Sequence, residues 1–205
     1  MTIIIPPNPE LDYQTVLSVL RNYAAPRKAL ADLIAKGKIT RIKKGIYVQS
    51  GRGIAPFSRE ILANMIYGPS YISYEYALSY HGLIPEQVTV VTSATTGKTK
   101  TFQTPVGIFR YSHQNQRVYA IGYRRNEIDD SRGFLIAGPE KSLADRIAKE
   151  PGRFSLRTMK QFLFENLRIE QSDFYNLDAA LLRDIASRGG KRSLHVLSTL
   201  RQDTP

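Results

Sequence analysis

The sequence predicts an α/β (α+β) protein, in which a small basic N-terminal unit precedes an α/β domain with a helical C-terminal end. Three observations predict this class. Apolar residues recur at helical spacing near both ends of the chain, β-rich segments fill the middle, and turn residues separate the segments. The 205 residues are enough to bury a core in each of two small domains.

The N-terminal segment is expected to form two helices and a two-stranded hairpin. A first helix is expected over about 11–23, where apolar residues recur at helical spacing. A second helix is expected to begin at Pro26 and to end at Gly37, since proline favours the first turn of a helix and glycine its end. Residues 39–42 and 46–48 then have the composition of strands that a tight turn connects.

Positive charge is concentrated in this helix–hairpin segment. Residues 26–44 hold seven lysines and arginines against one acid, Asp32. A helix followed by a basic hairpin is the outline of a winged helix-turn-helix, which puts a helix in a DNA groove and the wing on the phosphates. We therefore expect these residues to bind DNA: Arg27, Lys28, Lys36, Lys38, Arg41, Lys43, Lys44, Gly45 and Tyr47. The alternative is a solvated basic face on an ordinary helix–hairpin unit.

A glycine-containing polar linker at 49–53 is expected to divide the chain into two domains, residues 1–53 and 54–205. The segments expected to be helical beyond it are 59–66, 73–79, 139–148, 155–166, 177–187 and 191–200. The segments expected to be strands are 88–93, 99–103, 107–111, 118–123 and 134–137. Thr96-Gly97-Lys98 between two of these strands is expected to be a hairpin turn, since it lacks the upstream glycine of a phosphate-binding loop.

The overall composition favours a polyanionic partner. The net charge is +11 and the pI is about 9.9. Residues 1–55 hold nine lysines and arginines against three acids, so this quarter of the chain carries over half of the excess. The chain has no cysteine, no signal-peptide pattern and no apolar run of membrane-spanning length. We therefore expect a cytoplasmic protein that has no disulfide and no membrane partner.

Four segments together resemble the AbiEi family of antitoxins from bacterial type IV toxin–antitoxin systems. They are KKGIYV (43–48), PSYISYEYALSYHGLIPE (69–86), VTVVTSATTGKTKTFQTPVGIFRY (88–111) and IAGPEKSLAD (136–145). The resemblance covers about residues 11–148, and it is the order of these segments that makes it specific.

The resemblance implies a transcriptional autorepressor whose winged helix binds duplex operator DNA, with cooperative self-association on the DNA. It implies a second domain that counters a nucleotidyltransferase-like toxin without requiring a stable complex with it. Only two helices precede the expected wing, where a fuller winged helix has three. Arg27 and Lys28 favour the second helix as the one that enters the groove.

The rival interpretation is a metal-dependent nuclease or another nucleic-acid-processing enzyme. The residues that such an enzyme would use are Asp129-Asp130, Glu140-Lys141 and Asp145, because paired carboxylates bind metal and orient water. Glu140, however, directly follows a helix-opening proline, where a carboxylate stabilises the helix by roughly 0.3–1 kcal/mol. The three histidines are too scattered to suggest a metal site. We therefore expect a non-enzymatic protein without a cofactor.

A third interpretation is a structural RNA-binding module, because four tyrosines lie between residues 71 and 80 and aromatic rings can stack on unpaired bases. No lysine or arginine falls between residues 69 and 86. The cluster is therefore expected to serve packing.

Overall fold

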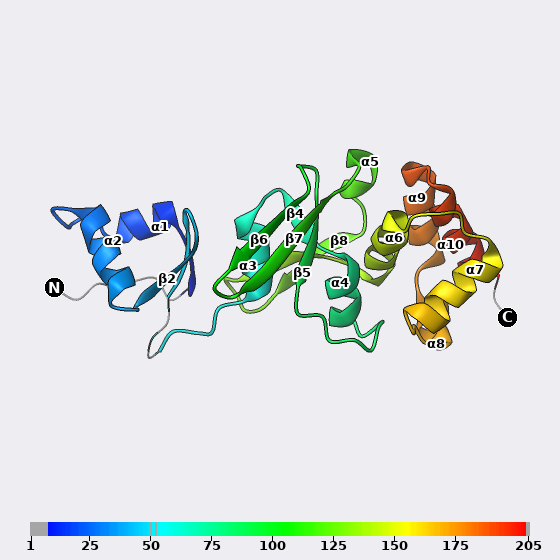
Figure 1. Cartoon of the computed structure of the whole chain (residues 1–205), viewed down its shortest axis with the longest axis horizontal. Coiled ribbons are helices and arrows are strands. Elements are labelled where there is room, and N and C mark those ends of the chain that lie inside the picture. The colour runs from blue at the N-terminus through cyan, green and yellow to red at the C-terminus, as the bar shows by residue number, and fades with distance from the viewer. Residues whose placement is uncertain (1–7, 50, 52, 204–205) are drawn as a thin grey trace.

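The structure is a computed structural model that describes residues 8–49, 51 and 53–203. Three groups of elements follow one another along its longest axis (Figure 1). They are an N-terminal unit (residues 8–49), a six-stranded sheet with its covering helices, and a C-terminal group of helices. The predicted mixed α/β class with a helical C-terminal end is confirmed.

The N-terminal unit contains two helices and a three-stranded antiparallel sheet of order β1-β3-β2. Its elements are β1 (Glu10–Asp12), α1 (Tyr13–Val19), α2 (Pro26–Ala35), β2 (Ile39–Lys43) and β3 (Ile46–Gln49). The helices pack against the sheet around Leu11, Leu30 and Tyr47. The first helix is shorter than predicted because Asp12 caps it, accepting a hydrogen bond of 2.7 Å from the backbone N–H of Thr15.

The central sheet is mixed, with strand order β6-β7-β5-β4-β9-β8. Its strands are β4 (Ser70–Ile72), β5 (Val91–Thr95), β6 (Lys100–Thr104), β7 (Gly107–His113), β8 (Tyr123–Glu127) and β9 (Gly133–Ala137). β5 pairs parallel with β7 and β4 pairs parallel with β9, while the other neighbours are antiparallel. Sequence patterns missed β4 and β8, both of which are short or strongly polar.

Two predictions in this region are wrong. The segment 96–99 is not a hairpin turn, because β5 pairs with β7 and β6 lies on the far side of β7. The expected strand at 118–123 is instead the short helix α5 (Gln116–Tyr119), which Asn115 caps by accepting from the N–H of Arg117 at 2.9 Å. A local side-chain cap therefore overrode the apolar pattern of this segment.

Helix α3 (Arg59–Ile66) contacts both β1 of the N-terminal unit and the central sheet, and α4 (Tyr74–Tyr80) packs between the sheet and α6. α3 begins at its N-cap Ser58, whose hydroxyl accepts from two backbone N–H groups of the first turn. Leu62 and Ile66 of α3 pack against Ile72 of β4. Side chains alternate along a strand, so the preceding residue, Tyr71, points to the other face of the sheet.

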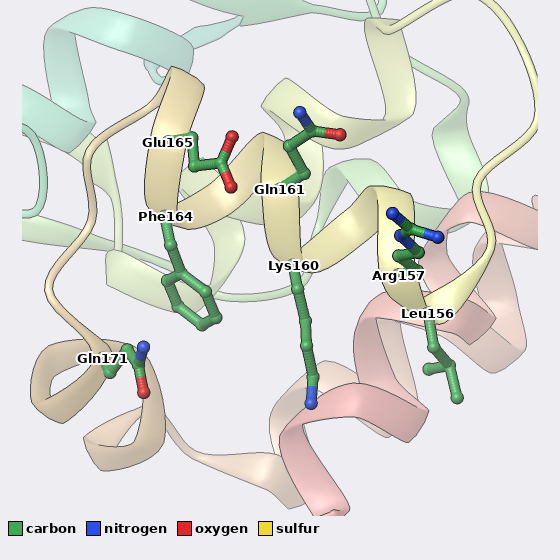
Figure 2. A pocket seen from close by; sticks show the side chains of 7 residues that line it. All are labelled: Leu156, Arg157, Lys160, Gln161, Phe164, Glu165 and Gln171. Carbon is green, nitrogen blue, oxygen red and sulfur yellow. The ribbon is translucent and has the colours of Figure 1, made fainter.

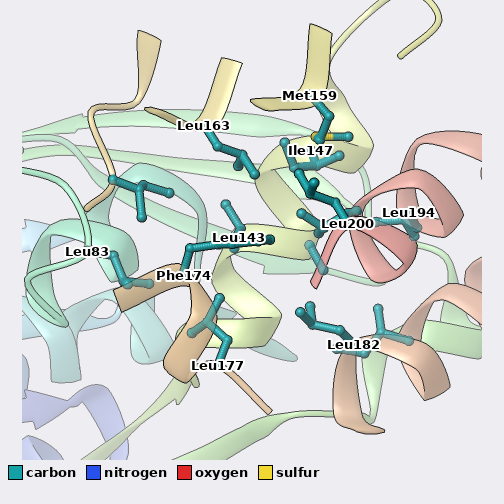
Figure 3. Packing of buried hydrophobic residues seen from close by; sticks show 14 of the residues in the cluster. Leu83, Leu143, Ile147, Met159, Leu163, Phe174, Leu177, Leu182, Leu194 and Leu200 are labelled. Atoms are coloured by element: carbon teal, nitrogen blue, oxygen red, sulfur yellow. The ribbon is translucent and has the colours of Figure 1, made fainter. Parts of the chain in front are cut away.

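The C-terminal group packs around a hydrophobic core that also includes Leu78 of α4 and the following Leu83 and Ile84 (Figure 3). Its elements are α6 (Pro139–Lys149), α7 (Leu156–Gln161), the π-helical turn η1 (Phe162–Asn166), α8 (Gln171–Asn176), α9 (Ala179–Gly189) and α10 (Arg192–Gln202). Leu143 and Ile147 of α6 meet Phe174 and Leu200 in this core. The predicted helices are confirmed, except that α8 was not expected and the last turn before residue 167 is π-helical.

The predicted linker at 49–53 is only partly described, since Ser50 and Arg52 lie outside the described residues. Apolar contacts cross this boundary, because Ile42 and Ile46 belong to the same core cluster as Leu62 of α3. The two predicted domains therefore share part of their core. Within the described ranges, no helix combines the length and the apolar character that crossing a membrane requires.

Candidate nucleic-acid interface

The N-terminal end of α2 presents two neighbouring cations to solvent. Arg27 and Lys28 are exposed, whereas Leu30 and Leu33 on the opposite side are buried against the sheet. This division follows from the sequence, because apolar residues three or four positions apart share one face of a helix and leave the other to polar residues. The helix thus holds the two cations on an outward-facing surface.

Positive charge continues from the end of α2 along β2. Lys36, Lys38 and Arg41 are exposed, and so is Lys44 in the turn between β2 and β3. Gly37 adopts φ +66°, a left-handed conformation that lets the chain leave the helix and enter the strand. We call Arg27, Lys28, Lys36, Lys38, Arg41 and Lys44 the basic surface. None of the six forms an ion pair with the residues that the structure describes.

Two hollows flank α2. One, of about 520 Å³, is almost wholly apolar apart from two guanidinium groups, and its lining residues are Leu17, Arg21, Ala25, Pro26 and Arg27. The other, of about 360 Å³, lies on the side of Lys28 and Lys36. Both hollows border the exposed side of α2 that carries Arg27 and Lys28.

Two of the predicted DNA-binding residues, Tyr47 and Lys43, do not belong to the basic surface. Tyr47 is only 5% exposed and packs in the core of the N-terminal unit, so its ring is not available to a nucleic acid. That prediction is wrong because β3 is the central strand of its sheet and is covered on both sides. Gly45 does sit in the β2–β3 turn, and its φ of +87° explains why a glycine is needed there.

Lys43 is the second of these residues: its side chain is half-buried and reaches α3 and the central sheet. Its Nζ donates a hydrogen bond of 2.7 Å to the backbone carbonyl of Ile66 and lies 4.5 Å from the ring centroid of Phe102. Burial, and to a lesser extent the nearby ammonium group of Lys100, lowers the pKa of Lys43. Lys43 is thus an interdomain contact here, unlike its exposed neighbour Lys44.

Three cations near this surface were not singled out from the sequence. Arg21 lines the larger hollow beside α2, and Lys98 and Lys100 are exposed beside Tyr67. Lys100 lies over the ring of Tyr67, with its Nζ 4.7 Å from the ring centroid. The signal in the sequence was the basic segment Gly97-Lys98-Thr99-Lys100, but nothing in it indicated that the fold would bring it close to Lys43.

The carboxylates of the nuclease interpretation do not converge. Asp129 lies in a surface turn, where a hydrogen bond from the Arg132 guanidinium at 2.7 Å is the main reason that its pKa falls to about 2. Glu140 accepts a hydrogen bond of 3.0 Å from the backbone N–H of Asp178. Asp145 is buried in the interior. Among the described residues, no cluster of acidic or histidine side chains is arranged to hold a metal ion.

Asp145 is the centre of a buried polar network that the sequence did not reveal. Its Oδ1 pairs with Nζ of Lys141 at 2.7 Å and accepts from Nε2 of Gln114 at 2.7 Å. Its Oδ2 accepts from the hydroxyls of Ser73, at 2.7 Å, and Tyr71, at 3.0 Å. Burial, followed by the charge of Asp145, raises the pKa of Tyr71 well above its usual value.

The second partner of Lys141 closes the network. Its Nζ also donates to the carbonyl of Val118 at 2.8 Å, and the whole side chain is fully buried. Lys141 and Asp145 lie one turn apart on α6, Tyr71 belongs to β4 and Val118 to α5, so the network joins β4, α5 and α6. Each charge is paired and hydrogen-bonded, so we interpret the network as a structural one that holds these elements together.

The tyrosine cluster also serves packing, as predicted. Tyr71 and Tyr74 are buried, and the ring of Tyr71 stacks on that of Tyr123 with centroids 4.8 Å apart. The hydroxyl group of Tyr76 donates a hydrogen bond to Glu60 on α3. Only Tyr80 is largely exposed, at 46%.

A separate groove of about 680 Å³ follows α7 and η1 at the other end of the molecule (Figure 2). Its lining residues are Leu156, Arg157, Lys160, Gln161, Phe164, Glu165 and Gln171. The groove is lined by two cations and one carboxylate, so its net charge is small compared with that of the basic surface. The basic surface is therefore the stronger candidate site.

No protein-family model matches the chain, and a search of curated proteins found no match either.

Proposed function

We propose that this protein binds duplex DNA through the basic surface of its N-terminal unit and represses transcription of its own operon. The observation that carries the proposal is the set of six exposed lysine and arginine side chains on α2, β2 and the β2–β3 turn. None of them has an anionic partner among the described residues. Unpaired cations on one continuous surface are the electrostatic footprint of a phosphate-binding protein.

In this proposal α2 is the reading helix of a winged helix-turn-helix. Its first turn carries Arg27, whose guanidinium can bind a guanine edge in the major groove with two hydrogen bonds. Ala25 and Pro26 beside it line an apolar hollow, which suits the methyl group of a thymine. Lys36, Lys38 and Arg41 then supply phosphate contacts that position the helix without reading sequence.

The resemblance to AbiEi antitoxins extends the proposal to the rest of the chain. We propose that the sheet and the C-terminal helices counter a nucleotidyltransferase-like toxin that a neighbouring gene encodes. The resemblance alone supports this antitoxin activity. It implies that a stable complex with the toxin is not required. Operon repression and toxin protection are therefore separate activities that separate variants should affect.

The decisive test of DNA binding is its salt dependence. The duplex upstream of the chain's own gene, labelled with a fluorophore, is titrated with the full chain between about 50 and 200 mM salt. With four to six phosphate contacts, log K is expected to fall against log salt with a slope of roughly −4 to −5. A flat response would overturn the proposal.

Matched lysine variants locate the binding surface. Lys28→Ala on α2 is expected to weaken binding, whereas Lys160→Ala, an equally exposed lysine on α7 at the far end of the molecule, should leave it unchanged. Equal losses for both variants would indicate non-specific attraction to a basic protein.

The antitoxin part is tested in cells that carry the neighbouring toxin gene under an inducible promoter. A charge reversal on the basic surface, Arg41→Glu with Lys44→Glu, is expected to derepress a promoter reporter and to preserve survival. We choose point variants over a fragment beginning near residue 54, because removing the N-terminal unit would uncover the apolar side chains of α3 that Ile42 and Ile46 contact. Loss of protection in a folded variant would show that both activities need the DNA-binding unit.

A further inference from the structure

Both ends of α3 are held by charged side chains of the N-terminal unit. At the start of the helix, Oε1 of Glu10 accepts a hydrogen bond of 2.5 Å from the backbone N–H of Ser58, the N-cap residue. At the end of the helix, Nζ of Lys43 donates to the carbonyl of Ile66 at 2.7 Å. The two side chains come from β1 and β2, the two outer strands of the N-terminal sheet.

The signs of these charges match the polarity of the helix. An α-helix carries partial positive charge at its N-terminus and partial negative charge at its C-terminus, so a carboxylate at the first and an ammonium at the second are both stabilising. Each also satisfies a backbone group that has no partner within the helix. A charge pattern that complements both ends of one helix makes Glu10 and Lys43 specific partners of α3.

Other contacts hold the same two side chains in place. Glu10 is only 8% exposed and its Oε2 lies 3.6 Å from Nη1 of Arg132. The ammonium of Lys43 lies over the ring of Phe102. Between the two charges, Ile42 and Ile46 pack against the body of α3.

We propose that Glu10 and Lys43 form a clasp on α3, which fixes the orientation of the DNA-binding unit relative to the central sheet. In this role Lys43 is a positioning residue between the two parts of the chain, and the phosphate contacts of the β2–β3 turn fall to Lys44. The basic surface and the sheet then act as one rigid body, so that α2 keeps a fixed orientation relative to the sheet. The statement about phosphate contacts depends on the proposed function, whereas the clasp itself does not.

The clasp is tested first without DNA, by hydrogen exchange of the α3 amides in the full chain. Lys43→Met keeps the length and apolar stem of the side chain but removes its charge, and Glu10→Gln is the corresponding change at the other end. Each is expected to speed exchange in α3 by about three- to tenfold. Lys44→Met, one residue away and exposed, is the control and should leave exchange unchanged.

A charge exchange between the two positions gives a sharper test. In the variant Glu10→Lys with Lys43→Glu, both charges oppose the helix polarity, so exchange in α3 should be faster than in either single variant. If the double variant restored the exchange rate of the original chain, the two side chains would be interacting with each other and the clasp would be overturned. Unchanged exchange in both single variants would overturn it as well.

DNA binding then assigns the role of Lys43. A phosphate contact contributes about one unit to the slope of log K against log salt. Lys44→Met is expected to reduce the slope by about one, while Lys43→Met leaves it unchanged. Equal reductions would make Lys43 a phosphate contact and overturn its assignment as a positioning residue. A slope of zero in the unsubstituted chain would instead contradict the proposed function and leave the exchange results on α3 to decide the clasp.

Discussion

The basic surface of the N-terminal unit and the network around Asp145 use charge in opposite ways. On the basic surface six cations lie in solvent with no anionic partner among the described residues. In the network a carboxylate and an ammonium are fully buried and every oxygen of Asp145 is hydrogen-bonded. Unpaired exposed charge costs the fold little and is available to a partner, whereas buried paired charge is committed to the fold.

The comparison predicts its largest effect at Asp145. Asp145→Ala leaves Lys141 buried without its counter-ion, which is expected to reduce the free energy of unfolding by about 3–5 kcal/mol in urea denaturation. The matched control is Asp184→Ala, which breaks the exposed pair with Arg188 and should cost less than about 0.5 kcal/mol. Equal effects would mean that the buried network is no more important to the fold than a surface ion pair.

The next effect is expected at Arg27. Arg27→Ala should weaken binding to the operator by about 1–3 kcal/mol and binding to random duplex by much less, if the guanidinium reads a base. Titrations of both duplexes with the same protein preparation measure the difference. Lys28→Ala is the control, since a phosphate contact weakens binding to both duplexes alike. An equal loss on both duplexes for Arg27 would assign it to the phosphate backbone as well.

A smaller effect distinguishes buried from exposed residues within one hairpin. Tyr47→Phe is expected to leave DNA affinity unchanged because the ring is buried, whereas Arg41→Ala should reduce the salt slope by about one. Anisotropy titrations over a salt series compare the two variants. A loss of affinity in a stable Tyr47→Phe variant would contradict the burial of this side chain.

The smallest effect concerns His81, whose Nε2 lies 2.7 Å from the carbonyl of Ala137. Burial, with a smaller contribution from Arg124, lowers the pKa of His81, although the Ala137 carbonyl and Glu140 act against it. The unfolded chain therefore binds this proton at a higher pH than the folded chain. The stabilisation is complete above the unfolded pKa of about 6.5 and is lost as pH falls toward the lower folded value.

Unfolding measured between about pH 5 and 7 in the original chain and in His81→Gln checks this sign. The original chain should lose more stability on acidification than the variant. His195→Gln, on an exposed histidine, is the matched control for the substitution itself. Identical profiles for the original chain and His81→Gln would exclude the histidine as the cause.

The sequence predicted those parts of the molecule that local patterns determine. α2 begins at Pro26 as predicted, because proline favours the first turn, and the basic residues on its outer face are exposed because the inner face is apolar. The tyrosine cluster was correctly assigned to packing, because its segment contains no cation.

Long-range pairing accounts for what the sequence could not show. The sequence predicts that Tyr47 is an exposed hairpin residue. In the structure β1 pairs with β3, the strand of Tyr47, and makes β3 a central strand. The hydrogen bonds from Tyr71 and Gln114 to Asp145 join residues far apart in the sequence, and they form only when the sheet and α6 are assembled. Lys43 and Lys44 are indistinguishable in sequence, and only the position of α3 gives them different partners. The segment Thr96-Gly97-Lys98 resembles a hairpin turn locally, but β7 occupies the place between its two strands.

The pairing of β4 with β9 has a consequence for synthesis on the ribosome. Ile72 of β4 pairs with Ile136 of β9, so one edge of β4 stays open until the second strand has left the exit tunnel. The N-terminal sheet needs nothing beyond residue 49 for its own strand pairing. A nascent chain can therefore pair the strands of its N-terminal sheet while the central sheet is still unfinished, and a chain released early would carry an unpaired, aggregation-prone edge on β4.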